Sequence, residues 1–181
     1  MPFKPREETL RSLASFPRLA VLICLVTLIT GSPVLAEDRD TASRLYQEGN
    51  LSLKAGNYDE ALRSFVASFT IYERLGHKLG MAANLNNVGY IHRMRGDYTA
   101  ALGHYNKSLT IMRQSGDEYV IATTLNNIGK VHEAKGDLTK ALSHYEQASK
   151  VFKEIDEKEL EAKVVKNIRL LKKKLGDSPR R

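Results

Sequence analysis

The chain has 181 residues, of which 42% are apolar and 27% are charged, with a formal net charge of +7. These values are typical of a globular protein rather than a disordered one. The single cysteine excludes a disulfide framework and a zinc cluster, and the lack of proline between residues 34 and 178 favours packed helices over a sheet with many turns.

The N-terminal segment, residues 1–36, has the pattern of a secretory signal. An apolar run over residues 19–30 is followed by Gly31 and Pro33 and then by Ala36, and it is preceded by four basic residues: Lys4, Arg6, Arg11 and Arg18. As a helix the run is about 18 Å long, which is shorter than a bilayer core of about 30 Å. We therefore expect cleavage after Ala36 and a periplasmic or secreted protein. An uncleaved anchor in the inner membrane is the alternative.

An internal repeat with a period of 40 residues fills most of the remaining chain. Gly49, Gly89 and Gly129 keep this spacing, and so do two further sets: Ala61, Ala101 and Ala141; and Phe65, Tyr105 and Tyr145. The segments 85–105 and 125–145 are near duplicates of each other. This self-similarity indicates a structural array of three units.

Each unit is predicted to form two helices joined by a tight turn. In the third unit, apolar residues at helical spacing predict helices over about 118–135 and 138–154. Gly136 suits the left-handed turn between them, and we expect Asp137 to cap the second helix. Gly129 allows the two helices to approach closely, and Tyr145 fills the space where they diverge.

This pattern resembles the tetratricopeptide repeat. The second unit supplies the signature at Leu85, Val88-Gly89, Gly96-Asp97-Tyr98, Ala101, Tyr105 and Ser108, and the other two units supply equivalent residues. The resemblance implies an all-α, right-handed solenoid with repeats at about 42–76, 82–116 and 122–156 within a domain over residues 37–181. Two features depart from the common form, because the period is longer than the usual 34 residues and the closing proline is absent.

The last part of the chain is expected to cap the array. Residues 157–175 resemble the first helix of a fourth unit, which gives seven helices in total, followed by a basic tail over residues 176–181. Residues 37–149 hold equal numbers of basic and acidic side chains, whereas residues 150–181 have a basic excess. This excess either solvates the cap or makes a weak contact with an anionic membrane. Nucleic acid is not an expected partner.

The resemblance implies that the first helix of each pair lines a concave groove that binds a peptide. Carrying the family's groove positions over to this chain gives ten candidates: Tyr46, Asn50, Asn86, Asn87, Tyr90, Arg93, Asn126, Asn127, Lys130 and Lys166. Adjoining positions hold Ser43, Lys54, Thr123, Glu133, Lys163 and Asn167.

The asparagines recur every 40 residues, and each amide can both donate to and accept from a peptide backbone. We expect Asn86 and Asn126 to face solvent or ligand. For Asn87, Asn127 and Asn167, a groove position and a hydrogen bond to the neighbouring helix both remain open.

One binding mode of the family, the carboxylate clamp for chaperone tails, is matched only at Asn50 and Asn87. Its basic positions are here Tyr46, Thr123 and Asn127, so a terminal carboxylate would lack its charge partners. The groove is instead expected to take an uncharged or modestly acidic peptide, with Tyr46 and Tyr90 as aromatic anchors.

No enzymatic activity is expected. The sequence has no nucleophile motif and no phosphate-binding glycine loop, and we predict neither a cofactor nor a metal. His92, His132, His104 and His144 are interpreted as packing residues rather than as metal ligands. The predicted function is an exported adaptor or assembly factor of the cell envelope that binds a protein segment in its groove. The alternative is a self-associating structural solenoid or a membrane-anchored scaffold without a peptide ligand.

Overall fold

The computed structural model describes residues 33–176, and these form seven helices without a strand among them. The helices are α3 (Pro33–Lys54), α4 (Tyr58–Arg74), α5 (Lys78–Met94), α6 (Tyr98–Ser115), α7 (Glu118–Ala134), α8 (Leu138–Glu154) and α9 (Lys158–Gly176). The predicted all-α fold of three helix pairs and a capping helix is confirmed. The contacts divide the chain into two units, residues 1–40 and 41–181.

The two ends of the chain carry predictions that the structure leaves open. The predicted signal falls mainly on residues 1–32, and the basic tail falls mainly on residues 177–181, which lie outside the described residues. Ala36, the residue before the predicted cleavage position, lies in α3. Within residues 33–176, no helix combines the length and the apolar character that a membrane span requires.

The turns between paired helices have the predicted glycine conformation, but of the two aspartates that follow these glycines only Asp97 makes a cap hydrogen bond. Gly96 and Gly136 have φ angles of 79° and 82°, in the left-handed region that favours glycine. Asp97 caps α6 by accepting a hydrogen bond from the backbone N–H of Ala100 at 3.1 Å. Asp137 occupies the predicted N-cap position of α8, but its side chain makes no cap hydrogen bond, and Oδ2 lies 3.3 Å from His132 Nδ1 instead.

The repeated glycines let an aromatic ring lie directly against the backbone of the preceding helix. A Cβ atom added to Gly129 would lie 2.6 Å from Tyr145 Cδ1, and one added to Gly89 would lie 2.9 Å from Tyr105 Cε1. Tyr105 and Tyr145 are both fully buried. The predicted close approach at Gly129 is therefore present, and the group that approaches the glycine is the Tyr145 ring of α8.

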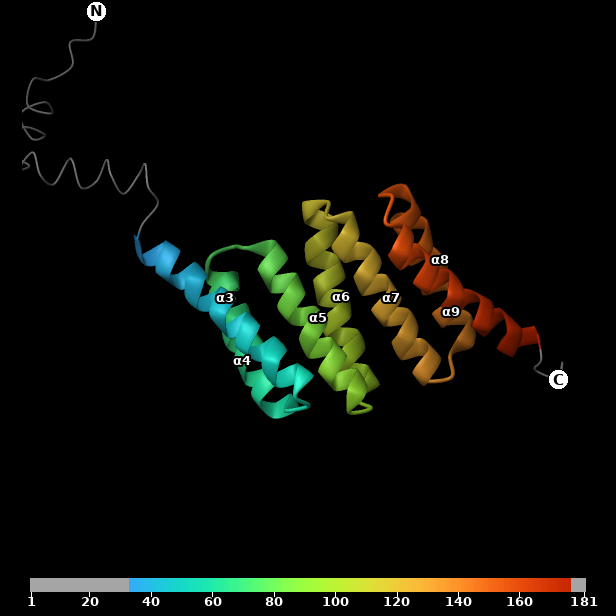
Figure 1. The fold of residues 1–181 in the computed structure, drawn as a ribbon, viewed down its shortest axis with the longest axis horizontal. Coiled ribbons are helices and arrows are strands. Elements are labelled where there is room, and N and C mark those ends of the chain that lie inside the picture. Colours follow the sequence, from blue (N-terminus) through green and yellow to red (C-terminus); the bar gives the residue numbers. More distant parts are fainter. Residues whose placement is uncertain (1–32, 177–181) are drawn as a thin grey trace, which may run out of the picture. The chain divides into compact units, whose positions relative to one another are not determined.

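Successive helices of the second unit pack side by side from α4 to α9, as Figure 1 shows. In addition, α5 contacts α7, so first helices of neighbouring repeats meet directly. A continuous apolar core runs through α5 to α9, and a smaller cluster around Phe65 joins α4 to α5. This arrangement is an α-solenoid in which each pair buries its apolar side against the next.

Four histidines form two stacked pairs inside the second and third repeats. The ring centroids of His92 and His104 are 5.2 Å apart, and those of His132 and His144 are 5.4 Å apart. The Nδ1 atoms of His104 and His144 are buried and lack a hydrogen-bond partner among the described residues. Burial lowers the pKa of both imidazoles, and the neighbouring histidine lowers each pKa further.

These lowered pKa values predict that the protein loses stability in weak acid. Because the ordinary histidine pKa is about 6.5, the unfolded chain takes up more protons than the folded chain below that pH. The contribution is complete above about pH 6.5 and is lost as the pH falls through the lower pKa of the folded state. Urea unfolding between pH 8 and pH 5 measures the effect. The double variant His104→Phe/His144→Phe should show a clearly flatter pH dependence, and an unchanged slope would contradict the assignment.

Candidate functional site

A cavity of about 380 Å³ crosses the first helices of all three repeats. Its lining residues come from α3, α5 and α7: Tyr46, Leu53, Ala83, Asn86, Asn87, Tyr90, Tyr119, Val120, Thr123 and Asn127. Five of the ten predicted groove residues belong to this set. The structure therefore brings the first helices together around one hollow, which we call the central cavity.

Three tyrosines, Tyr46, Tyr90 and Tyr119, line the central cavity. Tyr46 packs against the buried ring of Phe65, with the ring centroids 5.7 Å apart. The guanidinium carbon of Arg93 lies 5.0 Å from the centre of the Tyr90 ring, within cation–π range. Tyr119 is 47% exposed and lies at the first turn of α7. An apolar side chain could therefore enter between aromatic walls.

Asn86 lines this cavity, but its amide belongs to the packing between repeats. Its Nδ2 donates to Ser108 Oγ and to Thr124 Oγ1, both at 3.0 Å, and the Thr124 hydroxyl donates back to Asn86 Oδ1 at 3.1 Å. Ser108 in turn donates to the backbone oxygen of Ala82 at 3.2 Å. The prediction that the polar atoms of Asn86 face ligand is wrong, because α6 and α7 use them.

Asn87 takes both of the roles that the sequence left open. It lines the central cavity, and its Nδ2 donates to Asn50 Oδ1 at 3.2 Å, which links α5 to α3. Asn127 lines the same cavity from α7. Asn87 and Asn127 therefore place side-chain amides in the cavity lining, and an amide can both donate to and accept from a peptide backbone.

A second cavity, of about 180 Å³, lies between α7 and α9. It is lined by Tyr119, Thr123, Asn126, Lys130, Phe152, Leu160, Lys163, Val164 and Asn167. Asn126 Oδ1 and Thr123 Oγ1 are buried there without a hydrogen-bond partner among the described residues. Because Thr123 and Tyr119 line both cavities, the two hollows adjoin across α7.

The cations of the candidate set occupy two different environments. Arg93 and Lys130 are half-buried, whereas Lys166 is exposed on α9 and lines neither cavity. Burial lowers the pKa of Lys130, and the charge of Arg93 lowers it further. Glu133 is not free for a ligand, because it accepts hydrogen bonds from Tyr145 and Lys174.

Four residues that line the central cavity were not predicted from the sequence: Leu53, Ala83, Tyr119 and Val120. Tyr119, Thr123 and Asn127 are four residues apart and share one helix face, which is a signal that the sequence contained. The groove positions carried over from the resemblance start at Thr123 and therefore left Tyr119 out. Among residues 33–176, no group of three His, Cys, Asp or Glu residues is placed to hold a metal ion.

The comparisons with known proteins agree with this architecture. A family model described as tetratricopeptide repeat matches residues 40–114 and 80–154. None of the curated proteins matches this sequence significantly.

Similar solved structures include the apo form of RapI, with a TM-score of 0.71 and 18% identity over 76% of this chain and 50% of that chain. The complex of yeast Sti1 TPR2AB with pHSP90 has a TM-score of 0.65 and 22% identity over 76% of this chain and 48% of that chain. A Rap protein complexed with competence and sporulation factor has a TM-score of 0.70 and 17% identity over 76% of this chain and 39% of that chain. The chain thus spans half or less of the length of these proteins. At identities of 17–22%, the comparison shows a shared fold and nothing more.

Proposed function

The chain belongs to the tetratricopeptide repeat family, and from this premise we propose that it binds an extended segment of another protein along α3, α5 and α7. The observation that carries the proposal is the central cavity, which the first helices of three consecutive repeats build together. Its tyrosines offer apolar contact, and Asn87 and Asn127 offer hydrogen bonds to a peptide backbone. Two of the similar structures are complexes, of Sti1 with pHSP90 and of a Rap protein with competence and sporulation factor.

We further propose that the protein works in the bacterial cell envelope as an adaptor or assembly factor. The support is the signal-like segment over residues 1–36, with its basic start and short apolar run. Export with cleavage after Ala36 would leave a chain that begins at Glu37, and the intact mass of the exported protein tests this directly.

Peptide selection followed by a groove variant tests the binding function. Peptides selected on the full chain from a random displayed library should lose affinity by at least tenfold, ~1.4 kcal/mol, when Tyr90→Ala and Asn127→Ala are combined. Both side chains are only partly buried, so the helical circular dichroism should stay unchanged. Fluorescence anisotropy of a labelled selected peptide gives the affinity.

The matched control replaces two exposed amides on second helices, Asn106→Ala on α6 and Gln147→Ala on α8. It should bind the selected peptide as the parent chain does. If no peptide is selected, or if the groove variant binds equally well, the proposal is wrong. A size that grows with concentration in light scattering, together with a lack of peptide binding, would instead support the self-associating solenoid.

A further inference from the structure

The third repeat contains a small network in which a carboxylate satisfies two donors. Glu133 Oε2 accepts a hydrogen bond from the Tyr145 hydroxyl at 2.9 Å, and Glu133 Oε1 accepts one from Lys174 Nζ at 2.8 Å. Tyr145 is fully buried, so this carboxylate supplies the acceptor that its hydroxyl could not obtain from water.

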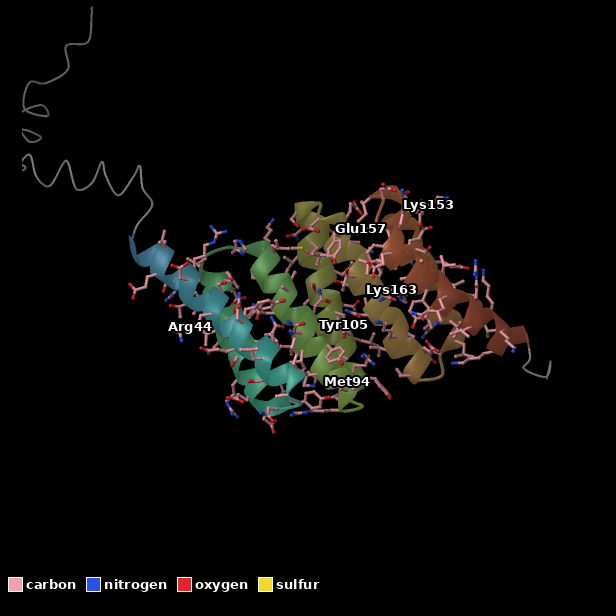
Figure 2. All side chains as sticks on the ribbon, in the orientation of Figure 1. Arg44, Met94, Tyr105, Lys153, Glu157 and Lys163 are labelled. Atoms are coloured by element: carbon pink, nitrogen blue, oxygen red, sulfur yellow. The ribbon has the colours of Figure 1, made fainter. Side chains whose placement is uncertain are left out.

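The second repeat keeps the buried tyrosine of this network but lacks its acceptor. Forty residues earlier, Tyr105 stands in the place of Tyr145 and Arg93 stands in the place of Glu133. The Tyr105 hydroxyl and Arg93 Nε are both buried, and neither meets an acceptor among the described residues. The Arg93 guanidinium interacts with the Tyr105 hydroxyl, but it can only donate to it. Figure 2 shows Tyr105 in the middle of the helical array, where it is fully buried. Buried donors without an acceptor are costly to a folded protein.

A second cation lies beside this unsatisfied pair. Lys130 is half-buried on α7, which packs directly against α5, the helix that carries Arg93. The charge of Arg93 lowers the pKa of Lys130, as burial also does. Within residues 33–176 neither side chain forms an ion pair with a carboxylate. Two adjacent, partly desolvated cations repel each other, and a bound anion would remove that repulsion.

We propose that Arg93 and Lys130 bind the side-chain carboxylate of an Asp or Glu in the peptide ligand, next to the buried Tyr105 hydroxyl. The ligand supplies in the second repeat the kind of acceptor that Glu133 supplies in the third. This inference rests on the proposed function and makes it narrower, because it assigns an acidic segment of another protein to the groove.

The chain's own ends are poor candidates for this site. Residues 1–36 contain four basic and two acidic side chains, and the segment after α9 ends in Arg180 and Arg181. A basic segment would add repulsion to Arg93 and Lys130. Charge complementarity therefore favours an acidic segment from a different molecule.

Tyr90 links the carboxylate site to the central cavity. The Arg93 guanidinium lies over the Tyr90 ring, and Tyr90 also lines the central cavity. Tyr90 and Arg93 are three residues apart on α5, which corresponds to about 4.5 Å along a helix and to one or two residues of an extended chain at ~3.3 Å each. The acidic residue of the ligand should therefore lie within two positions of a large apolar residue.

A library of C-terminally amidated nonapeptides tests this inference on the full chain. Each peptide has leucine at the centre and random residues elsewhere, so every available carboxylate is on a side chain. We expect the bound peptides to be enriched in Asp or Glu within two positions of the leucine. R93E should abolish this enrichment and weaken the best acidic peptide at least tenfold, ~1.4 kcal/mol. Because R93E gives Tyr105 and Lys130 the carboxylate that Tyr145 and Lys174 already have, the variant should remain folded.

R113E is the matched control, since it makes the same charge change at an exposed position on α6. It should keep the acidic preference and the affinity. Bound peptides without acidic enrichment, or an R93E variant that keeps the acidic preference, would each overturn the inference while the groove function stands. A parent chain that binds no peptide at all would overturn the proposed function and this inference with it.

Discussion

Gly129→Ala should destabilise the protein by about 3 kcal/mol or more, although it adds a single methyl group. The new Cβ atom would lie 2.6 Å from Cδ1 and 2.7 Å from Cε1 of Tyr145. That ring cannot move aside, because it is fully buried and its hydroxyl is held by Glu133. Helices α7 and α8 would have to separate, and the core on both sides would lose packing. Urea unfolding followed by far-ultraviolet circular dichroism measures the change.

Gly103→Ala is the control with the opposite expected sign. Gly103 lies in α6, is exposed, and has no atom within 4 Å of an added Cβ. Alanine there reduces the freedom of the unfolded chain and should stabilise the protein by about 0.5–1 kcal/mol. If the two substitutions changed stability in the same direction, Tyr145 would not be packed against Gly129 as described.

Much of the fold could be predicted because the residues that pack the helix pairs recur every 40 residues in the sequence. The pairing of Gly89 with Tyr105, and of Gly129 with Tyr145, recurs at one spacing and leaves few alternatives to nested helix pairs. Helix α8 has the predicted bounds, and α7 ends one residue before the predicted end. The largest difference is α3, which begins at Pro33 rather than near residue 42. Proline suits a first helical position, since its missing N–H leaves no intrahelical bond unmade.

The site could be predicted only in outline, because its polar atoms depend on partners in other repeats. Asn86 and Asn126 occupy equivalent positions, yet one is fully bonded and the other has an unpaired oxygen. The reason is that Ser108 and Thr124, which hold Asn86, are replaced by Ala148 and Val164 one repeat later. The different hydrogen bonding of Asn86 and Asn126 can be predicted only when the contact between α5 and α7 is known.

The hydrogen bonds of Glu133 could not be predicted from the sequence. Its lysine partner is 41 residues away on the capping helix, so their contact does not follow the period of 40. A list of groove positions therefore included a carboxylate that the cap uses. The lack of an acceptor for the Tyr105 hydroxyl could not be predicted either, because whether a donor finds an acceptor depends on the packed structure.

Leu171→Ala in the capping helix should cost about 2–5 kcal/mol, whereas Leu170→Ala should change stability by less than about 0.5 kcal/mol. The two leucines are adjacent in α9, but Leu171 is fully buried and Leu170 is 52% exposed. Leu171 and Val164 are the cap residues that close the end of the apolar core. In a solenoid each unit is stabilised mainly by its neighbours, so the loss should appear first as opening of α9 and then of α8. Hydrogen exchange followed by mass spectrometry should therefore show faster exchange in α9 of the Leu171→Ala variant, with α5 and α6 still protected. Equal effects of the two substitutions, or faster exchange along the whole array, would show that α9 does not act as a separable cap.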